Sequence, residues 1–280
     1  MKKLLTSACA LTLLANVASA QLFGIGTVGA TDTLYTINTT TGAATSVFSW
    51  TNGGGTTSNG LAFNPTTNKF NTVHYLSANS TQLWEIDAVA LTATSVTHQI
   101  PNPYFEGVEY SAALGGLVVS YGSNNFTNSL ALLNNSYNLI GNQPTNLLND
   151  TDCLFTTSTG DLNSLDTNNP TGGFQRNLLN NPFGANSNTG VGLNMFNSGL
   201  DFDLAWKQDE ARLFLTRGFA LAEVNPASTL ISSIGNFGPG ANGTLIRISG
   251  IAVNPVPEPT SMMALAAGLG ILAKKRRRKA

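Results

Sequence analysis

The chain has 280 residues and a formal net charge of −1, and 42% of its residues are hydrophobic. It contains two cysteines, which cannot supply the disulfide framework of a small secreted domain, so a packed core must hold the fold.

The first 20 residues are typical of a secretory signal peptide. The basic pair Lys2-Lys3 precedes an apolar stretch from Leu4 to Ala15, and Ala18-Ser19-Ala20 forms an A-x-A cleavage site. We therefore expect signal peptidase to cut before Gln21, which becomes the first residue of the exported chain.

The region between residues 21 and 256 is acidic. Its fourteen Asp or Glu and six Lys or Arg give a net charge of −8. An acidic exported body would repel nucleic acid, so we expect no nucleic-acid partner. Gly, Asn, Thr and Ser are abundant and no long helical period occurs, which predicts an all-β fold with many turns.

A repeat of about 47 residues runs through this region. Its first marker is a short strand that usually opens with glycine. It occurs as Gly60-Leu-Ala-Phe63, Gly107-Val-Glu-Tyr110, Asp152-Cys-Leu-Phe155, Gly199-Leu-Asp-Phe202 and Gly250-Ile-Ala-Val253. Its second marker is an apolar residue followed by Asn or Asp at a strand end, where the polar side chain suits a turn. It occurs as Ile37-Asn38, Ile86-Asp87, Leu133-Asn134, Leu179-Asn180 and Val224-Asn225.

The two markers alternate five times, and a unit of this length with several short strands matches a four-stranded propeller blade. The sequence predicts a single five-bladed β-propeller over residues 21–254. Because the region begins with the second marker and ends with the first, the last strand, Gly250–Val253, should complete the N-terminal blade in a circular closure. An open β-solenoid or a sandwich is the alternative.

Alternation along the first marker predicts a side-chain direction. The second and fourth residues of each marker are apolar and should pack between blades, and the first and third should line the central channel. This arrangement would gather Glu109, Asp152 and Asp201 around the axis, with Glu106, Asp150 and Asp203 nearby. Such carboxylates could bind Ca²⁺ or act as the acid and nucleophile of a glycosidase, and the remaining alternative is a polar channel with no specific role.

Other signs of catalysis are weak. His74 and His98 lack the spacing of a zinc site, and we interpret them as surface or hydrogen-bonded residues. Cys153, the one cysteine between residues 21 and 256, is interpreted as a small buried hydrophobe. We expect neither a catalytic residue nor a cofactor other than the candidate Ca²⁺.

The C-terminal segment 255–280 has three parts. Pro257-Glu258-Pro259 precedes an apolar run from Ser261 to Ala273, and Lys274, Lys275, Arg276, Arg277, Arg278 and Lys279 follow. As a helix the apolar run would reach about 20 Å, short of the roughly 30 Å of a bilayer core unless the flanking lysines snorkel. We expect a marginal transmembrane anchor whose basic end stays cytoplasmic.

These three parts, in this order, resemble the PEP-CTERM sorting signal of Gram-negative bacteria. The resemblance implies that a membrane-embedded exosortase recognises the Pro-Glu-Pro triplet and removes the helix and basic tail. The protein would be anchored transiently in the inner membrane and then released to the cell surface or the exopolysaccharide matrix.

The sequence therefore favours an exported, non-enzymatic propeller that binds polysaccharide or a surface protein. A carbohydrate-active enzyme that uses the channel carboxylates is the alternative, and a structural matrix component without a discrete ligand is a third hypothesis.

Overall fold

A computed structural model describes residues 20–54, 57–77, 80–100, 104–123, 126–144, 151–157, 159–166, 173–178, 190–196, 203–225, 230–240 and 243–254. Residues 21–254 form one compact unit, which is considered by itself below. The predicted signal peptide up to residue 19, the anchor helix and the basic tail lie outside the described residues. Among the residues described, none belongs to a helix that is long and apolar enough to cross a membrane.

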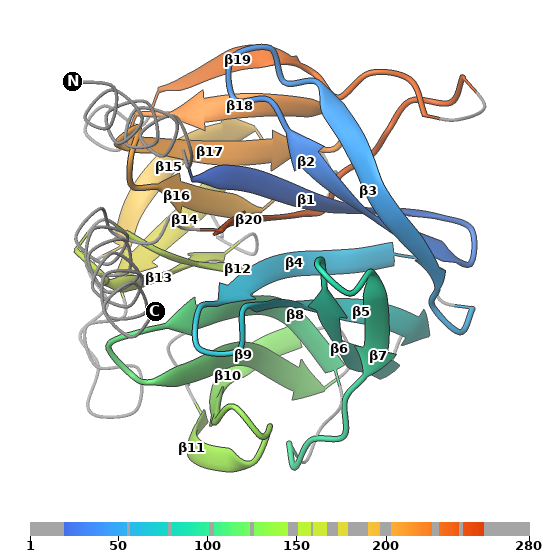
Figure 1. Cartoon of the computed structure of the whole chain (residues 1–280). Coiled ribbons are helices and arrows are strands. Elements are labelled where there is room, and N and C mark those ends of the chain that lie inside the picture. The colour runs from blue at the N-terminus through green and yellow to red at the C-terminus, as the bar shows by residue number, and fades with distance from the viewer. Residues whose placement is uncertain are drawn as a thin grey trace, which may run out of the picture. The chain divides into compact units, whose positions relative to one another are not determined.

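The described strands form five antiparallel sheets of four strands each (Figure 1). The first sheet contains β20 (Gly250–Asn254), β1 (Gln21–Val28), β2 (Thr31–Ile37) and β3 (Ala44–Thr51). The second contains β4 (Thr57–Asn64), β5 (Lys69–Ser77), β6 (Ser80–Asp87) and β7 (Thr92–Ser95). The third contains β8 (Tyr104–Ser111), β9 (Gly116–Ser123), β10 (Phe126–Leu133) and β11 (Leu139–Pro144). The fourth contains β12 (Thr151–Thr156), β13 (Leu162–Asp166), β14 (Gly173–Leu178) and β15 (Gly190–Phe196). The fifth contains β16 (Leu204–Lys207), β17 (Arg212–Arg217), β18 (Ala220–Val224) and β19 (Ile231–Asn236).

The first sheet joins the two ends of this unit. β20 pairs antiparallel with β1, from Gln21 opposite Asn254 to Ile25 opposite Gly250. The predicted role of Gly250–Val253 as the strand that completes the N-terminal sheet is therefore confirmed.

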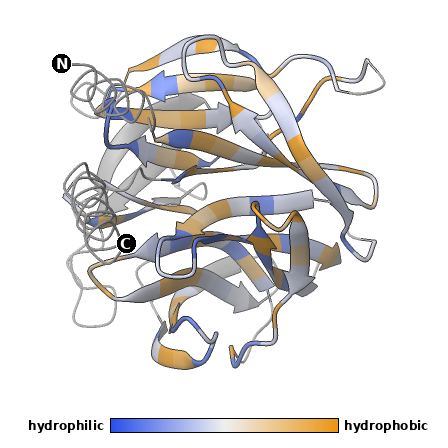
Figure 2. Cartoon of the chain, in the orientation of Figure 1, coloured by the Kyte–Doolittle hydropathy of each residue, from blue (hydrophilic) through white to orange (hydrophobic). Residues whose placement is uncertain are grey.

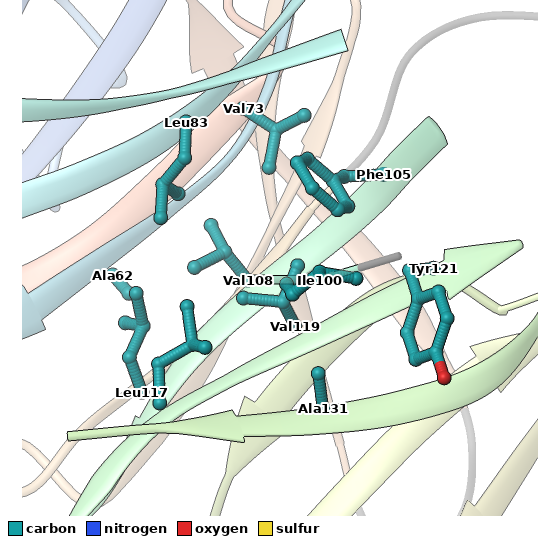
Figure 3. Packing of buried hydrophobic residues seen from close by; sticks show 11 residues of the cluster. Ala62, Val73, Leu83, Ile100, Phe105, Val108, Leu117, Val119, Tyr121 and Ala131 are labelled. Atoms are coloured by element: carbon teal, nitrogen blue, oxygen red, sulfur yellow. The ribbon is translucent and has the colours of Figure 1, made fainter. Parts of the chain in front are cut away.

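Apolar side chains fill the junctions between successive sheets. Five buried clusters lie between the first and second, second and third, third and fourth, fourth and fifth, and fifth and first sheets. Figure 3 shows the second junction, where Ala62, Val73 and Leu83 face Val108 and Val119. Figure 2 correspondingly shows apolar residues along the strands of several sheets rather than gathered in one layer. The sheets form a ring, and the all-β propeller prediction is confirmed.

The second marker stands at a strand end, as predicted, and where the structure describes it this strand is the third of its sheet. Asn38 Oδ1 accepts the N–H groups of Thr40 and Thr41 at 2.9 and 3.0 Å. Asp87 Oδ1 accepts those of Val89 and Ala90 at 3.0 and 2.8 Å. Asn134 Oδ1 does the same for Ser136 and Asn138. At these three strand ends the polar side chain therefore satisfies the backbone of the turn that follows.

The first marker needs two corrections of register. The inner strand of the fifth sheet is β16, which begins at Leu204, so Asp203-Leu-Ala-Trp206 replaces the predicted Gly199–Phe202, which lies outside the described residues. In the fourth sheet the frame shifts by one residue. Leu154 packs toward the third sheet, and Cys153 with Phe155 packs toward the fifth, so Cys153 takes the glycine position.

The predicted direction of the third residue within the first marker is also wrong. Ala62 packs between the second and third sheets and Ala252 between the first and second, rather than lining a channel. The reason is that each sheet in the ring is covered on both faces, so alternate residues of an inner strand point to the two neighbouring sheets. The apolar second residues Leu61, Val108 and Leu204 are buried between sheets, as predicted.

Candidate functional site

The leading residue of the first marker, in its corrected register, lies near the axis in each of the five sheets. These residues are Gly60, Gly107, Cys153, Asp203 and Gly250. A Cβ atom on Gly250 would lie 2.6 Å from the carbonyl carbon of Gly60, and one on Gly107 would lie 3.1 Å from the backbone nitrogen of Leu154. At Gly250 the inner strands approach too closely for a side chain, and at Gly107 a Cβ would make a tight contact. The side chains of Cys153 and Asp203 extend from the two inner strands that lack a glycine there, and they are hydrogen-bonded to each other.

Asp203 is the central polar group of this axial cluster. Its Oδ2 accepts the backbone N–H groups of Leu61 at 3.1 Å and Ile251 at 2.8 Å. Its Oδ1 accepts the N–H of Leu204 and the thiol of Cys153, each at 2.9 Å. One carboxyl group therefore contacts the inner strands of the second, first, fifth and fourth sheets.

The electrostatics of the axial cluster follow from its burial. Desolvation raises the pKa of Asp203 to about 7, although hydrogen bonds from Cys153, Ile251, Leu204 and Leu61 act in the opposite direction. Burial, together with the charge of Asp203, raises the pKa of Cys153 well above its ordinary range, so the thiol stays protonated and can donate its hydrogen bond. The prediction of a buried, unreactive Cys153 is supported by this environment.

Of the three predicted cation ligands, the structure describes the side chain of Glu109. Glu109 lies on β8 and accepts a hydrogen bond from Thr156 Oγ1 of β12 at 2.8 Å. Desolvation is the main reason that its pKa rises to about 8, and the nearby charge of Asp203 contributes. The side chain of Asp152 and all of Asp201 lie outside the described residues. No group of three or more His, Cys, Asp or Glu that could hold a metal occurs in the described part of the chain. The Ca²⁺ site therefore stays a prediction.

A second buried polar cluster joins the first and second sheets. Ser58 Oγ lies 2.8 Å from Asp32 Oδ2 and 3.0 Å from His74 Nδ1. Asp32 also accepts hydrogen bonds from Thr27 Oγ1 at 2.6 Å and Asn52 Nδ2 at 3.0 Å. Burial alone would raise the pKa of Asp32, but the hydrogen bonds from His74, Thr27 and Asn52 outweigh it and hold the pKa below its usual range.

This cluster has the residue types of a serine-hydrolase triad but not the arrangement. In a triad, one imidazole nitrogen faces the serine and the other nitrogen faces the carboxylate. Here Ser58 Oγ and Asp32 Oδ2 both face Nδ1 of His74, the latter at 3.2 Å, and all three side chains are buried. The cluster therefore links two sheets rather than activating a nucleophile. His74 is buried and hydrogen-bonded through Nδ1, but its Nε2 has no partner among the described residues, so the prediction holds only in part. His98 accepts the N–H of Ile100 at 3.3 Å.

The sequence places Asp203 near the axis, as predicted, but does not indicate that it is the central residue. The signal for that role is the resemblance of Asp203-Leu-Ala-Trp206 to Gly60-Leu-Ala-Phe63, in which Asp203 takes the place of the leading glycine. The second cluster was not predicted. Ser58 and His74 are cross-strand partners in β4 and β5, which is visible only once the register of that hairpin is known.

Comparison with known proteins adds a motif and a fold. Residues 255–279 match the PEP-CTERM protein-sorting motif. The body is similar to a chain in the crystal structure of a nidogen/laminin complex (TM-score 0.53, 11% identity, covering 84% of this chain and 98% of that chain). It is also similar to TolB from Acinetobacter baumannii (TM-score 0.51, 12% identity, covering 90% and 71%). At these identities the likeness shows the propeller-like fold alone. No curated protein matches the chain.

The sorting motif indicates how the protein is exported and processed, which the fold does not. It implies an exported protein that is anchored in a membrane, processed by exosortase and cleaved, which agrees with the expectation from Pro257-Glu258-Pro259 and the basic tail.

Proposed function

We propose that this protein is an exosortase-sorted propeller that is displayed at the cell surface or in the exopolysaccharide matrix, where it has a binding or structural role rather than a catalytic one. Signal peptidase and exosortase are its processing partners, and a polysaccharide or a surface protein is its ligand. We interpret the five sheets as five blades of one closed ring that presents its connecting loops to that ligand.

The observation that carries this proposal is the way in which Asp203 is used. Its two oxygens accept hydrogen bonds from three backbone N–H groups and one thiol of the protein itself. A catalytic carboxyl needs contact with substrate, and this one is 1% exposed. The acidic residue at the centre of the ring is therefore best explained as a structural group, which favours a ligand bound by the outer loops.

One observation favours the alternative, a glycosidase-like enzyme. Glu109, with a pKa near 8, lies close enough to Asp203, with a pKa near 7, for their charges to interact. A carboxyl group that stays protonated near neutral pH is what a general acid requires. The test is to offer the purified protein a panel of polysaccharides and to compare Glu109→Gln with Asp161→Asn, a change in an exposed turn. Hydrolysis that Glu109→Gln abolishes and Asp161→Asn preserves would replace our proposal.

The sorting part of the proposal has its own experiment. Replacing Pro257, Glu258 and Pro259 with alanine should leave the full-length chain in the inner-membrane fraction with its basic tail attached, because the exosortase would no longer recognise it. Antibodies to the body and to the tail would follow both parts through fractionation. Normal release of the triple-alanine chain would contradict sorting by this motif.

A further inference from the structure

Gln21 has an unusual position in the closed ring. It is the first residue of β1 and lies opposite Asn254, at the end where the last strand joins the first. Its side chain is exposed, whereas the next five residues of the strand are buried. If signal peptidase cuts after Ala18-Ser19-Ala20, Gln21 carries the α-amino group of the exported chain.

We propose that this N-terminal Gln21 cyclises to pyroglutamate. The α-amino nitrogen attacks Cδ of the residue's own side-chain amide, a new C–N bond closes a five-membered lactam, and the former amide nitrogen leaves as ammonia. The step needs no oxidant, reductant or cofactor. It exchanges a charged ammonium for a neutral amide and leaves the rest of the chain unchanged.

The fold accommodates the five-membered lactam without loss of packing. The exposed Gln21 side chain contributes nothing to the buried cluster that begins with Leu22, so drawing it back onto its own nitrogen removes no core contact. No residue precedes Gln21 after cleavage, so no peptide bond is distorted. The lactam keeps the Gln21 carbonyl and one N–H group, which are the backbone groups that a strand end offers to its neighbour.

Cyclisation would protect the closure of the ring. Leu22 is 1% exposed, lies opposite both Val253 and Ile37, and packs between the first and fifth sheets. In a protein released from the cell, an aminopeptidase that removes Gln21 would next reach this residue. A lactam has no free α-amine, so such an enzyme cannot begin.

The experiment is mass spectrometry of the N-terminal peptide of the protein recovered after export. This inference rests on the proposed export, and the measurement separates the two. A peptide that begins at residue 21 and is lighter by one ammonia supports both. A peptide that begins at residue 21 with a free amine overturns the cyclisation and leaves the processing intact. A peptide that begins elsewhere overturns both.

Gln21→Asn is the matched variant. It keeps an exposed amide side chain, but cyclisation in the same manner would require a strained four-membered ring. We expect this variant to retain a free amine and an unchanged melting temperature. A purified aminopeptidase should then trim the variant and leave the parent chain intact. Equal trimming of both proteins would contradict the protective role.

Discussion

Asp203 accepts the backbone N–H of Ile251 at 2.8 Å, and this bond joins the fifth sheet to the strand that closes the first. The same oxygen accepts the N–H of Leu61 in the second sheet. A ring of sheets normally relies on apolar packing between neighbours, but here a single polar side chain also connects sheets that are not adjacent in sequence.

Removing this carboxyl should destabilise the whole ring. In Asp203→Ala, the N–H groups of Leu61, Leu204 and Ile251 lose their acceptor inside a buried site, and each buried unsatisfied donor costs about 1–3 kcal/mol. We expect the free energy of unfolding to fall by at least about 2 kcal/mol in urea titrations. Asp161→Ala, at an exposed turn, should stay within about 0.5 kcal/mol of the parent. Equal stability of the two variants would contradict the role assigned to Asp203.

The axial carboxyls should make the protein more stable at pH 5 than at pH 8. Asp203 and Glu109 titrate in the folded state at about 7 and about 8, above their ordinary values of 3.8 and 4.5. Between about pH 4 and pH 8 the folded state therefore binds more protons than the unfolded state. The stabilisation that is fully present below pH 4 is lost as the pH rises through 7 and 8. Asp32 acts in the opposite sense because its pKa is lowered, but its contribution is lost only in acid. Burial also lowers the pKa of His98, which offsets part of the gain below about pH 6.5.

Urea unfolding at pH 5, 6, 7 and 8 measures this dependence. Glu109→Gln should make the curve shallower, since the amide can still accept the hydrogen bond from Thr156 but does not titrate. Stability that rises steadily from pH 5 to pH 8 would be the contrary result.

The close approach of the inner strands can be tested by adding one methyl group. In Gly250→Ala, the new Cβ would lie 2.6 and 2.8 Å from the carbonyl carbon and oxygen of Gly60, which are backbone atoms and cannot turn aside. We expect a loss of about 1–3 kcal/mol, as for other overpacked sites. Gly240→Ala is the control, because its nearest neighbour would be 3.2 Å away in a connecting segment. If calorimetry gave the same melting temperature for the two variants, the inner strands would have space for a methyl group at Gly250.

The circular closure predicts a further cost at Ile251. This side chain is 1% exposed and packs against the fifth sheet, so Ile251→Ala should destabilise the protein by about 2–5 kcal/mol. Val28→Ala removes apolar atoms from a side chain that is 64% exposed and should be nearly neutral. Thermal unfolding would compare the melting temperatures of both variants with that of the parent. A small effect of Ile251→Ala would mean that closure adds little to stability.

The repeat and its closure could be predicted from the sequence because they depend on periodic features. Apolar residues recur in each unit, and Asn38, Asp87 and Asn134 recur where a strand meets a turn. The register of the inner strands was harder. In the fourth sheet, a shift of one residue exchanges the two faces of a strand, and both frames of Asp152-Cys-Leu-Phe-Thr156 look plausible because the apolar residues are adjacent.

The sequence places Asp203 near the axis, but its central role and the second buried cluster could not be predicted, for a different reason. Asp203 replaces a glycine that the other units favour, and only the convergence of distant N–H groups makes a buried carboxyl acceptable there. Asp32, Ser58 and His74 come from three strands, and nothing in their local sequences indicates that they meet.

The pairing of β20 with β1 also determines when the protein can finish folding. The first and last strands of the body lie side by side, so the closing sheet cannot form until the chain has been made through residue 254. The sorting motif begins at the next residue, 255. A chain that stops anywhere before β20 therefore lacks both the strand that closes the ring and the motif that sorts the protein, so the molecules that carry the motif are those that can also close.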